Sequence, residues 1–266
     1  MSTSTPHAAA LAEPGPVPAA PGASPRRTLA AALCAVLGIA LLGGAALTGW
    51  AEHHAAHRPL SADAAYRRAG SLWHTAPVDT LFPPVLAGPD TGPGGADRTW
   101  TRVALAPDSE CGPALPPDWR AALTPTGCTR VLRATYADAT RSSLVAVGMV
   151  FTPADTEAEA DTMASLRGHL PAPPAYGFGD GRRAAWTASV LPDAPVVVYT
   201  VSAFADGRVF SAPVPAEDAV RKDATGAVAQ AGLGHAAKAV AERVEHTVRE
   251  LAAPTAPAAA APEARR

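Results

Sequence analysis

Several residue types are rare or missing in this sequence, and their absence limits what the protein can be. Its 266 residues include no asparagine, one isoleucine (Ile39) and two lysines (Lys222 and Lys238). Without asparagine there is no acceptor for N-glycosylation. Aromatic residues make up 5% of the chain against 48% hydrophobic residues, and much of the remainder is alanine, which buries little area. The formal net charge of -2 excludes the overall basic charge that attracts nucleic acid.

Motifs of common catalytic sites are also missing. The chain contains no Gly-Xaa-Ser-Xaa-Gly elbow, no Walker loop and no His-Glu-Xaa-Xaa-His motif. Residues 177–181 are rich in glycine, but no strand pattern leads into them and no clear helix pattern follows, as a dinucleotide-binding turn would require. The sequence therefore predicts no catalytic residue, no cofactor and no nucleic-acid partner.

One long apolar run lies near the beginning of the sequence. No charged residue occurs in residues 28–51, and about 20 helical residues span roughly 30 Å, the thickness of a bilayer's hydrocarbon core. Arg26 and Arg27 directly precede the run, which by the positive-inside rule keeps the N-terminus in the cytoplasm. We expect a transmembrane helix at 28–50 that contacts the lipid bilayer and anchors the protein in the cell membrane. The alternative is a cleaved signal and a secreted protein.

The rest of the chain divides by composition. Residues 1–27, on the cytoplasmic side, and residues 253–266 are rich in proline and alanine, and we expect both tails to be disordered. In residues 51–96 we expect a juxtamembrane helix that starts near Ser61, followed by a linker rich in proline and glycine at 78–95. Residues 97–252 are expected to form one extracytoplasmic domain.

Short strand patterns alternate with two helical patterns in that domain. We expect strands at 100–105, 130–136, 143–151, 184–191, 195–204 and 208–214, and helices at 155–169 and 216–251. Gly226, Gly232 and Gly234 weaken the second helix. The polar segment 137–142 and the Asp206-Gly207 pair predict antiparallel hairpins. The order implies an α+β fold, in which two helices cover one face of an antiparallel sheet.

Cys111 and Cys128 are the two cysteines outside the apolar run. An exported domain lies in an oxidising compartment, where two such cysteines most simply form one disulfide. Their spacing fits neither a Cys-Xaa-Xaa-Cys redox motif nor a zinc site. We expect a structural disulfide that contributes roughly 3 kcal/mol through loop closure.

Three histidines follow the apolar run in the order His-His-Ala-Ala-His. His53 and His57 would share one face of a helix, a spacing that can hold a transition metal, with Glu52 or His74 as a further ligand. The competing interpretation is a polar juxtamembrane segment in which His53, His54 and His57 titrate near neutral pH.

The chain as a whole resembles the uncharacterised single-pass membrane proteins of actinobacteria. The resemblance covers the chain in outline: a proline- and alanine-rich cytoplasmic tail, an anchor preceded by two arginines, and two short stretches of sequence. It implies location and architecture and transfers no catalytic residue. The residues that carry it are Arg26, Arg27, Thr80, Leu81, Phe82, Pro83, Cys111, Cys128, Thr129, Arg130, Arg133, Ala134, Thr135, Tyr136, Ala137 and Asp138.

Three functions of different classes stay open. The favoured one is a non-enzymatic, membrane-anchored extracytoplasmic module that binds a protein partner or a cell-envelope component. The second is an envelope hydrolase whose catalytic residues are dispersed in sequence, which requires a pocket that joins His169 or His235 to acids and a serine. The third is metal or pH sensing through His53, His54 and His57.

Overall fold

The computed structural model describes residues 25–56, 61–153 and 157–253, and the chain divides into two compact units, Met1–Arg58 and Pro59–Arg266. The first unit contains helix α1 (Pro25–Ala56), which is long and apolar enough to cross a membrane over Leu33–Trp50, with a mean hydropathy of 1.9. This helix agrees with the expected span at 28–50 and begins slightly earlier, so that Arg26 and Arg27 lie in its first turn. The two expected tails otherwise lie outside the described residues.

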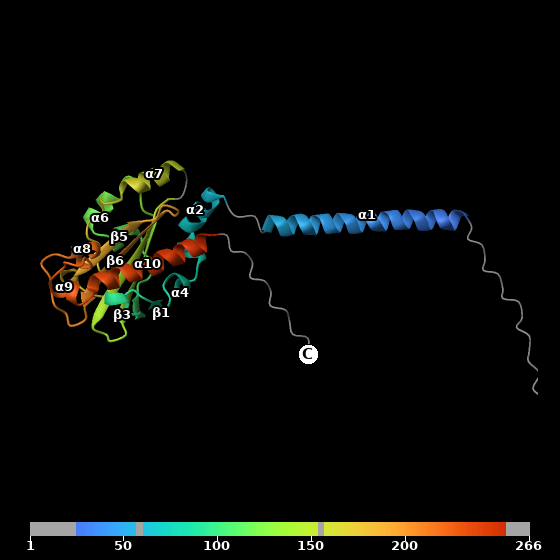
Figure 1. Cartoon of the computed structure of the whole chain (residues 1–266). Coiled ribbons are helices and arrows are strands. Elements are labelled where there is room, and N and C mark those ends of the chain that lie inside the picture. The colour runs from blue at the N-terminus through green and yellow to red at the C-terminus, as the bar shows by residue number, and fades with distance from the viewer. Residues whose placement is uncertain (1–24, 57–60, 154–156, 254–266) are drawn as a thin grey trace, which may run out of the picture. The chain divides into compact units, whose positions relative to one another are not determined.

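The second unit is built on a seven-stranded sheet (Figure 1) with the strand order β1-β2-β3-β4-β6-β5-β7. Every pair is antiparallel except β5 with β7. The expected hairpin is confirmed, because residues 130–137 pair with residues 151–144 in continuous register. The strands are β1 (Val85–Gly88), β2 (Arg98–Leu105), β3 (Arg130–Asp138), β4 (Ser143–Phe151), β5 (Ala185–Val190), β6 (Val196–Phe204) and β7 (Val214–Pro215).

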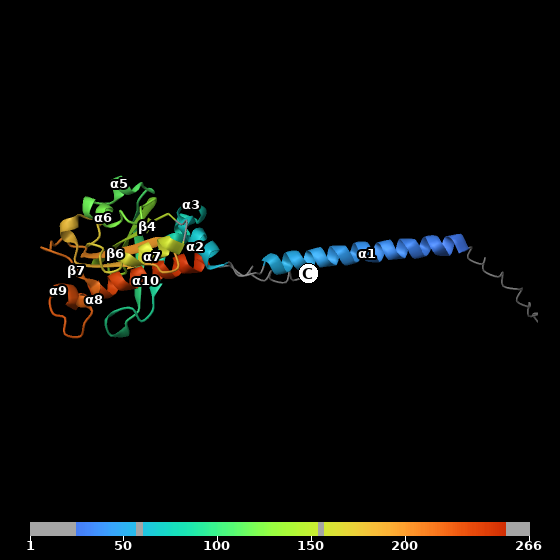
Figure 2. The ribbon, with the colours of Figure 1, turned by 90° about the horizontal axis from the view of Figure 1, so that it is seen from above.

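Helices lie on both faces of this sheet, with α10 on one side of the strands and α5 and α6 on the other (Figure 2). The expectation of two helices over one face was therefore wrong. β4 and β6 are almost continuously apolar, and because successive side chains point to opposite faces, both faces must be covered. The helices are α2 (Ala62–Gly70), α3 (Leu72–Thr75), α4 (Val78–Leu81), α5 (Cys111–Ala114), α6 (Pro117–Ala122), α7 (Glu157–Ser165), α8 (Ala216–Ala219), α9 (Ala227–Gln230) and α10 (Leu233–Ala252), with short 3-10 turns at Pro93–Gly95 and Asp180–Arg182.

The first face is covered by α10 together with α2, α3 and α4. Val240, Val244 and Val248 of α10 pack there against alternate residues of β4 and β6. On the second face, α5, α6 and α7 place Trp119 and Met163 against the other set of strand residues. The result is a sheet between two helical layers, each with its own apolar core.

Residues 78–88 were interpreted as part of a linker, but they belong to the compact unit. Leu81, Phe82 and Leu86 are buried in the same core as Trp100, and the Tyr136 hydroxyl donates a hydrogen bond to the Pro83 carbonyl at 2.9 Å. The many prolines and glycines around these apolar residues are typical of a linker, so the local sequence pattern did not indicate that they are buried. The unit also includes the expected helix after Ser61, whose side chain accepts a hydrogen bond from the Ala64 amide at 3.3 Å.

Residues 208–213 do not form the expected strand. β6 pairs with β4 on one side and with β5 on the other, so no position beside it is left for a strand after the Asp206-Gly207 turn. Instead, Arg208 pairs with Asp206 at 2.5 Å and lies over the Phe204 ring. Only the two residues of β7 rejoin the sheet, in parallel with β5.

The long helix expected at 216–251 is divided into α8, α9 and α10. The breaks fall where the sequence indicated weakness, because Gly226 and Gly232 have φ angles of 103° and 68°, which favour glycine. Gly234 lies inside α10 and does not interrupt it. A Cβ built at this position would lie 2.9 Å from the carbonyl oxygen of Ala216 in α8, which is too close. Glycine therefore serves close packing at this position.

The expected disulfide is present between Cys111 and Cys128, whose Cα atoms lie 6.2 Å apart. It closes the segment that holds α5 and α6 over the second face of the sheet. Trp119 of α6 is fully buried there, and its indole nitrogen donates to the Ala172 carbonyl at 3.3 Å. The disulfide therefore fixes the ends of a segment that covers a core.

Candidate functional site

A cavity of about 450 Å³ lies beside the outer edge of β5, and we call it the β5-edge groove. One side is formed by β5 itself and another by α10. Gly168 and Leu170, which follow α7, and residues 215–217 at the start of α8 complete the lining. Thr187 and Ser189 of β5 and Ala241 of α10 are among the lining residues between strand and helix. The volume falls within the range of about 300–1,000 Å³ typical of ligand sites.

The strand that borders this groove has a free edge. β7 covers only Ala185 and Trp186 on the outer side of β5, and no strand in the described part of the chain pairs with residues 187–190 there. The Leu191 amide donates to the Val196 carbonyl at 3.1 Å. Leu191 therefore turns its backbone polar groups toward β6, and every second residue before it in β5 does the same. By antiparallel geometry, the amides and carbonyls of Ala188 and Val190 then point away from β6, toward the groove side.

This edge lacks the features that usually protect a sheet edge from pairing. Natural proteins place charged residues, proline or bulges on exposed edge strands. Residues 186–190 are Trp-Thr-Ala-Ser-Val, with no charge and no proline. At the opposite edge of the sheet, β1 has four residues and lies between Pro84 and Pro89. The unprotected edge is therefore the one beside the groove.

A chain of hydrogen bonds fixes β5 to α10 underneath the groove. The hydroxyls of Thr187 and Thr200 lie 2.8 Å apart, and Thr200 donates to the Ala237 carbonyl at 2.9 Å. Thr200 is fully buried, so these bonds join strand and helix within the core. The two walls formed by β5 and α10 are therefore joined to each other by hydrogen bonds.

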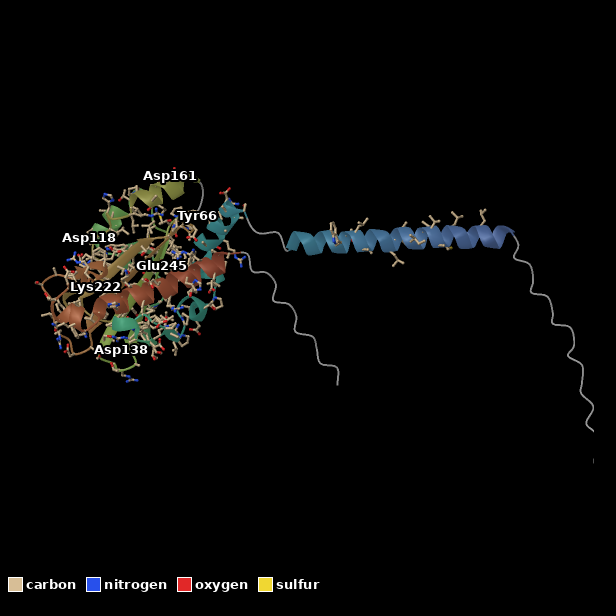
Figure 3. All side chains as sticks on the ribbon, in the orientation of Figure 1. Tyr66, Asp118, Asp138, Asp161, Lys222 and Glu245 are labelled. Atoms are coloured by element: carbon tan, nitrogen blue, oxygen red, sulfur yellow. A yellow bond between two sulfur atoms is a disulfide. The ribbon has the colours of Figure 1, made fainter. Side chains whose placement is uncertain are left out.

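The charged side chains that line the groove are three carboxylates and one ammonium group. They belong to Glu217, Glu242, Glu245 and Lys238. Glu245, labelled in Figure 3, is largely buried and accepts a hydrogen bond from Arg249 at 3.1 Å. Glu217 and Glu242 are exposed, and neither takes part in an ion pair within the described residues.

A second cavity, of about 310 Å³, lies between α3, α4 and the ends of β2 and β3. Its lining is mainly apolar and includes Trp73 and Leu132. The Arg130 guanidinium lies 4.6 Å from the centre of the Trp73 ring and pairs with Asp108 at 3.6 Å. Trp73 is thus held by a cation–π contact at the rim of this cavity.

The histidines considered for hydrolysis do not form the required pocket. His235 lines a small cavity of about 270 Å³ with Asp90, Thr91, Lys238 and Glu242, and no serine lines it. Burial and the nearby charges of Arg98 and Lys238 lower the pKa of His235. His169 is exposed, and its Nδ1 lies 3.0 Å from the Arg167 carbonyl. Neither histidine is brought together with both an acid and a serine in the described part of the chain.

The candidate metal site falls mostly outside what the structure describes. His57 is not among the described residues, and only the helical backbone of His53 and His54 is described. His74 lies against Trp73, with ring centres 4.4 Å apart. Among the described residues there is no group of three or more His, Cys, Asp or Glu side chains placed to hold a metal ion.

The groove was not foreseen from the sequence. Glu217 and Glu242 had no pattern around them that separates them from ordinary surface charges. The one available signal was the uncharged, proline-free stretch 186–190, which shows an unprotected strand but not its position at an edge. Comparison with protein-family models, curated proteins and solved structures finds no match. The function is therefore argued from the geometry of the domain.

Proposed function

We propose that the protein is a single-pass membrane protein whose C-terminal domain lies outside the cytoplasm and binds an extended segment of an envelope partner in the β5-edge groove. The observation that carries this proposal is the unpaired outer edge of residues 187–190, which borders a cavity of about 450 Å³. Extended peptides add to such edges as an extra strand, with main-chain hydrogen bonds for affinity and neighbouring pockets for specificity.

Two features support the location. The apolar helix α1 is long enough to cross a bilayer, and two arginines stand in its first turn, which favours a cytoplasmic N-terminus. The Cys111–Cys128 disulfide is consistent with an oxidising compartment outside the cytoplasm. Both point to the same orientation, with residues 61–253 exported.

Labelling of single cysteines from outside intact cells tests the topology. In a Cys34→Ala background, Ala139→Cys places a thiol on the exposed turn between β3 and β4, and Ser4→Cys places one in the N-terminal tail. We expect a membrane-impermeant maleimide to label the first variant on intact cells and the second only after permeabilisation. The reverse pattern would contradict the orientation, and a soluble form in the medium would indicate a cleaved signal.

Photo-crosslinking tests the groove. A photoreactive amino acid at Ser189, which lines the groove, should give a discrete crosslinked band in cells. The same residue at Ala139, on an exposed turn outside the groove, is the control and should not. Ala188→Pro removes an amide that points away from β6, so it should abolish the band without breaking the β5–β6 ladder. Equal crosslinking from both sites, or a band that survives Ala188→Pro, would refute docking at this edge.

A further inference from the structure

We infer that the segment bound in the β5-edge groove is a basic polypeptide, in which arginine or lysine side chains alternate along an extended strand. This inference rests on the proposed function and goes beyond it. It selects a cationic protein segment over an anionic envelope polymer as the occupant of the groove.

The first argument is the charge that faces the open space. The lining holds the carboxylates of Glu217, Glu242 and Glu245 against the single ammonium group of Lys238. Glu245 is already paired with Arg249, whereas Glu217 and Glu242 are exposed and enter no ion pair among the described residues. Two carboxylates and the Lys238 ammonium group are thus left to meet charges on a ligand, and together they carry one net negative charge. A phosphate- or carboxylate-rich polymer would place like charges beside them, which is unfavourable.

The second argument is the position of the groove carboxylates along β5. β5 and α10 run in the same direction. Near the start of both elements, Thr200, the partner of Thr187, donates to the Ala237 carbonyl. Near their ends, Arg249 of α10 pairs at 3.6 Å with Asp193, which follows β5. The carboxylates of α10 therefore lie along the edge, and Glu217 lies at the end where β7 stops. Acidic groups accompany the free edge over its length.

The third argument is the spacing that an added strand would present. Alternate side chains of a strand lie on one face, about 6.6 Å apart. Because Arg249 holds Glu245, the carboxylates of the lining that such side chains can meet are Glu217 and Glu242. Basic side chains at alternate positions of an added strand form one row of positive charges on the face turned toward them. The outward amides and carbonyls of Ala188 and Val190 would at the same time complete the backbone ladder.

Binding of three defined peptides to the purified full-length chain in detergent tests the inference. The probes are fluorescent eight-residue peptides: alternating Arg-Val, alternating Glu-Val, and Arg-Val with N-methyl groups along one backbone edge. We expect the Arg-Val peptide to bind, the Glu-Val peptide not to bind at the same concentration, and N-methylation to weaken binding at least tenfold. Binding of the Arg-Val peptide should weaken further as salt concentration rises.

Variants of the groove carboxylates provide the second readout. Glu217→Gln and Glu242→Gln should each weaken Arg-Val binding by about 2- to 5-fold, the range for exposed ion pairs. Both side chains are exposed, so the fold should be kept, and an unchanged thermal midpoint verifies this. Glu250→Gln, on the same helix but outside the groove lining, is the matched control and should bind as the unmodified chain does.

Several outcomes would overturn the inference. These are no binding of the Arg-Val peptide up to millimolar concentration, equal binding of the Glu-Val peptide, or no effect of Glu217→Gln and Glu242→Gln. Arg-Val binding that appears only after deletion of residues 254–266 would show that the chain's own C-terminal segment, which ends in two arginines, is the occupant. If crosslinking from Ser189 persists in cells while the peptides fail, the proposed function stands and only the basic character of the partner is refuted.

Discussion

Gly148 is a position where one added methyl group tests the packing of the second face directly. Gly148 of β4 pairs with Tyr199 of β6, and the phenol ring of Tyr199 lies across the glycine, in the space that a Cβ would occupy. Tyr199 is 1% exposed, and its ring centre lies 5.1 Å from that of Trp119. Burial raises the pKa of the Tyr199 hydroxyl, so the ring stays neutral. The ring cannot move without disturbing Trp119.

The size of the effect follows from two opposing contributions. Forcing an extra methyl group into a packed core costs about 1–3 kcal/mol. Replacing glycine inside a strand by alanine raises the free energy of unfolding by roughly 0.5–1 kcal/mol, because alanine loses less backbone entropy on folding. The overlap of a Cβ with ring atoms places Gly148→Ala at the upper end of the cost, so we expect a net loss of about 2 kcal/mol. In a domain of this size that lowers the thermal midpoint by about 4–8 °C.

Urea unfolding of a double-mutant cycle isolates the contact. Tyr199→Val removes the ring, and in that background Gly148→Ala should be neutral or stabilising by up to about 1 kcal/mol. Gly179→Ala is the control, because Gly179 has a negative φ and nothing lies within 4 Å of a Cβ built there; its effect should stay within about 0.5 kcal/mol. If Gly148→Ala costs the same with and without the Tyr199 ring, the reasoning is refuted.

Three further predictions concern stability. Replacing Cys111 and Cys128 by alanine should lower the free energy of unfolding by about 3 kcal/mol, from their sequence separation of 17, measured by denaturant unfolding against the chain without reductant. Asp138→Asn should cost about 1–3 kcal/mol at neutral pH, because the buried carboxylate accepts the Ser143 amide at 2.8 Å and bonds from two turn hydroxyls. Ser61→Ala should destabilise α2 by about 1 kcal/mol through loss of the N-cap, whereas Ser61→Asp should not.

The Asp138 prediction carries a pH dependence of known sign. Burial alone would raise the pKa of Asp138, but hydrogen bonds from Thr140, Ser142 and the Ser143 amide lower it below its usual value. A carboxyl group with a lowered pKa in the folded state contributes stability above its unfolded pKa of about 3.9, and this is lost as the pH falls through the folded value. The Asp138→Asn variant should therefore lack this acid-dependent part of the free energy of unfolding. An unchanged acid profile would contradict this pH dependence. Undiminished stability of the variant without Cys111 and Cys128 would contradict the separate prediction for the disulfide.

Much of the local structure could be predicted from the sequence, because its signals lie between neighbouring residues. The strand at 143–151 was found at its observed bounds from a continuous apolar run, and the hairpin with β3 from the short polar segment between them. Gly226 and Gly232 marked real helix breaks, and Ser61 a real helix start. The candidate site had no such signal, because the sequence pattern of a strand does not show whether it lies at the edge or in the centre of a sheet.

The sequence by itself determined the apolar helix near the N-terminus, strands β2 to β6, helices α2, α7 and α10, and the cysteine pair, because periodicity, hydropathy and turn residues act over short distances. Only the tertiary structure decided that β6 lies between β4 and β5, which removed the strand expected at 208–214. It also decided that helices cover both faces and that Leu81, Phe82 and Leu86 are buried. Those outcomes depend on which distant segments pair and bury one another. The free edge of β5, on which the proposed function rests, is a consequence of that order of strands.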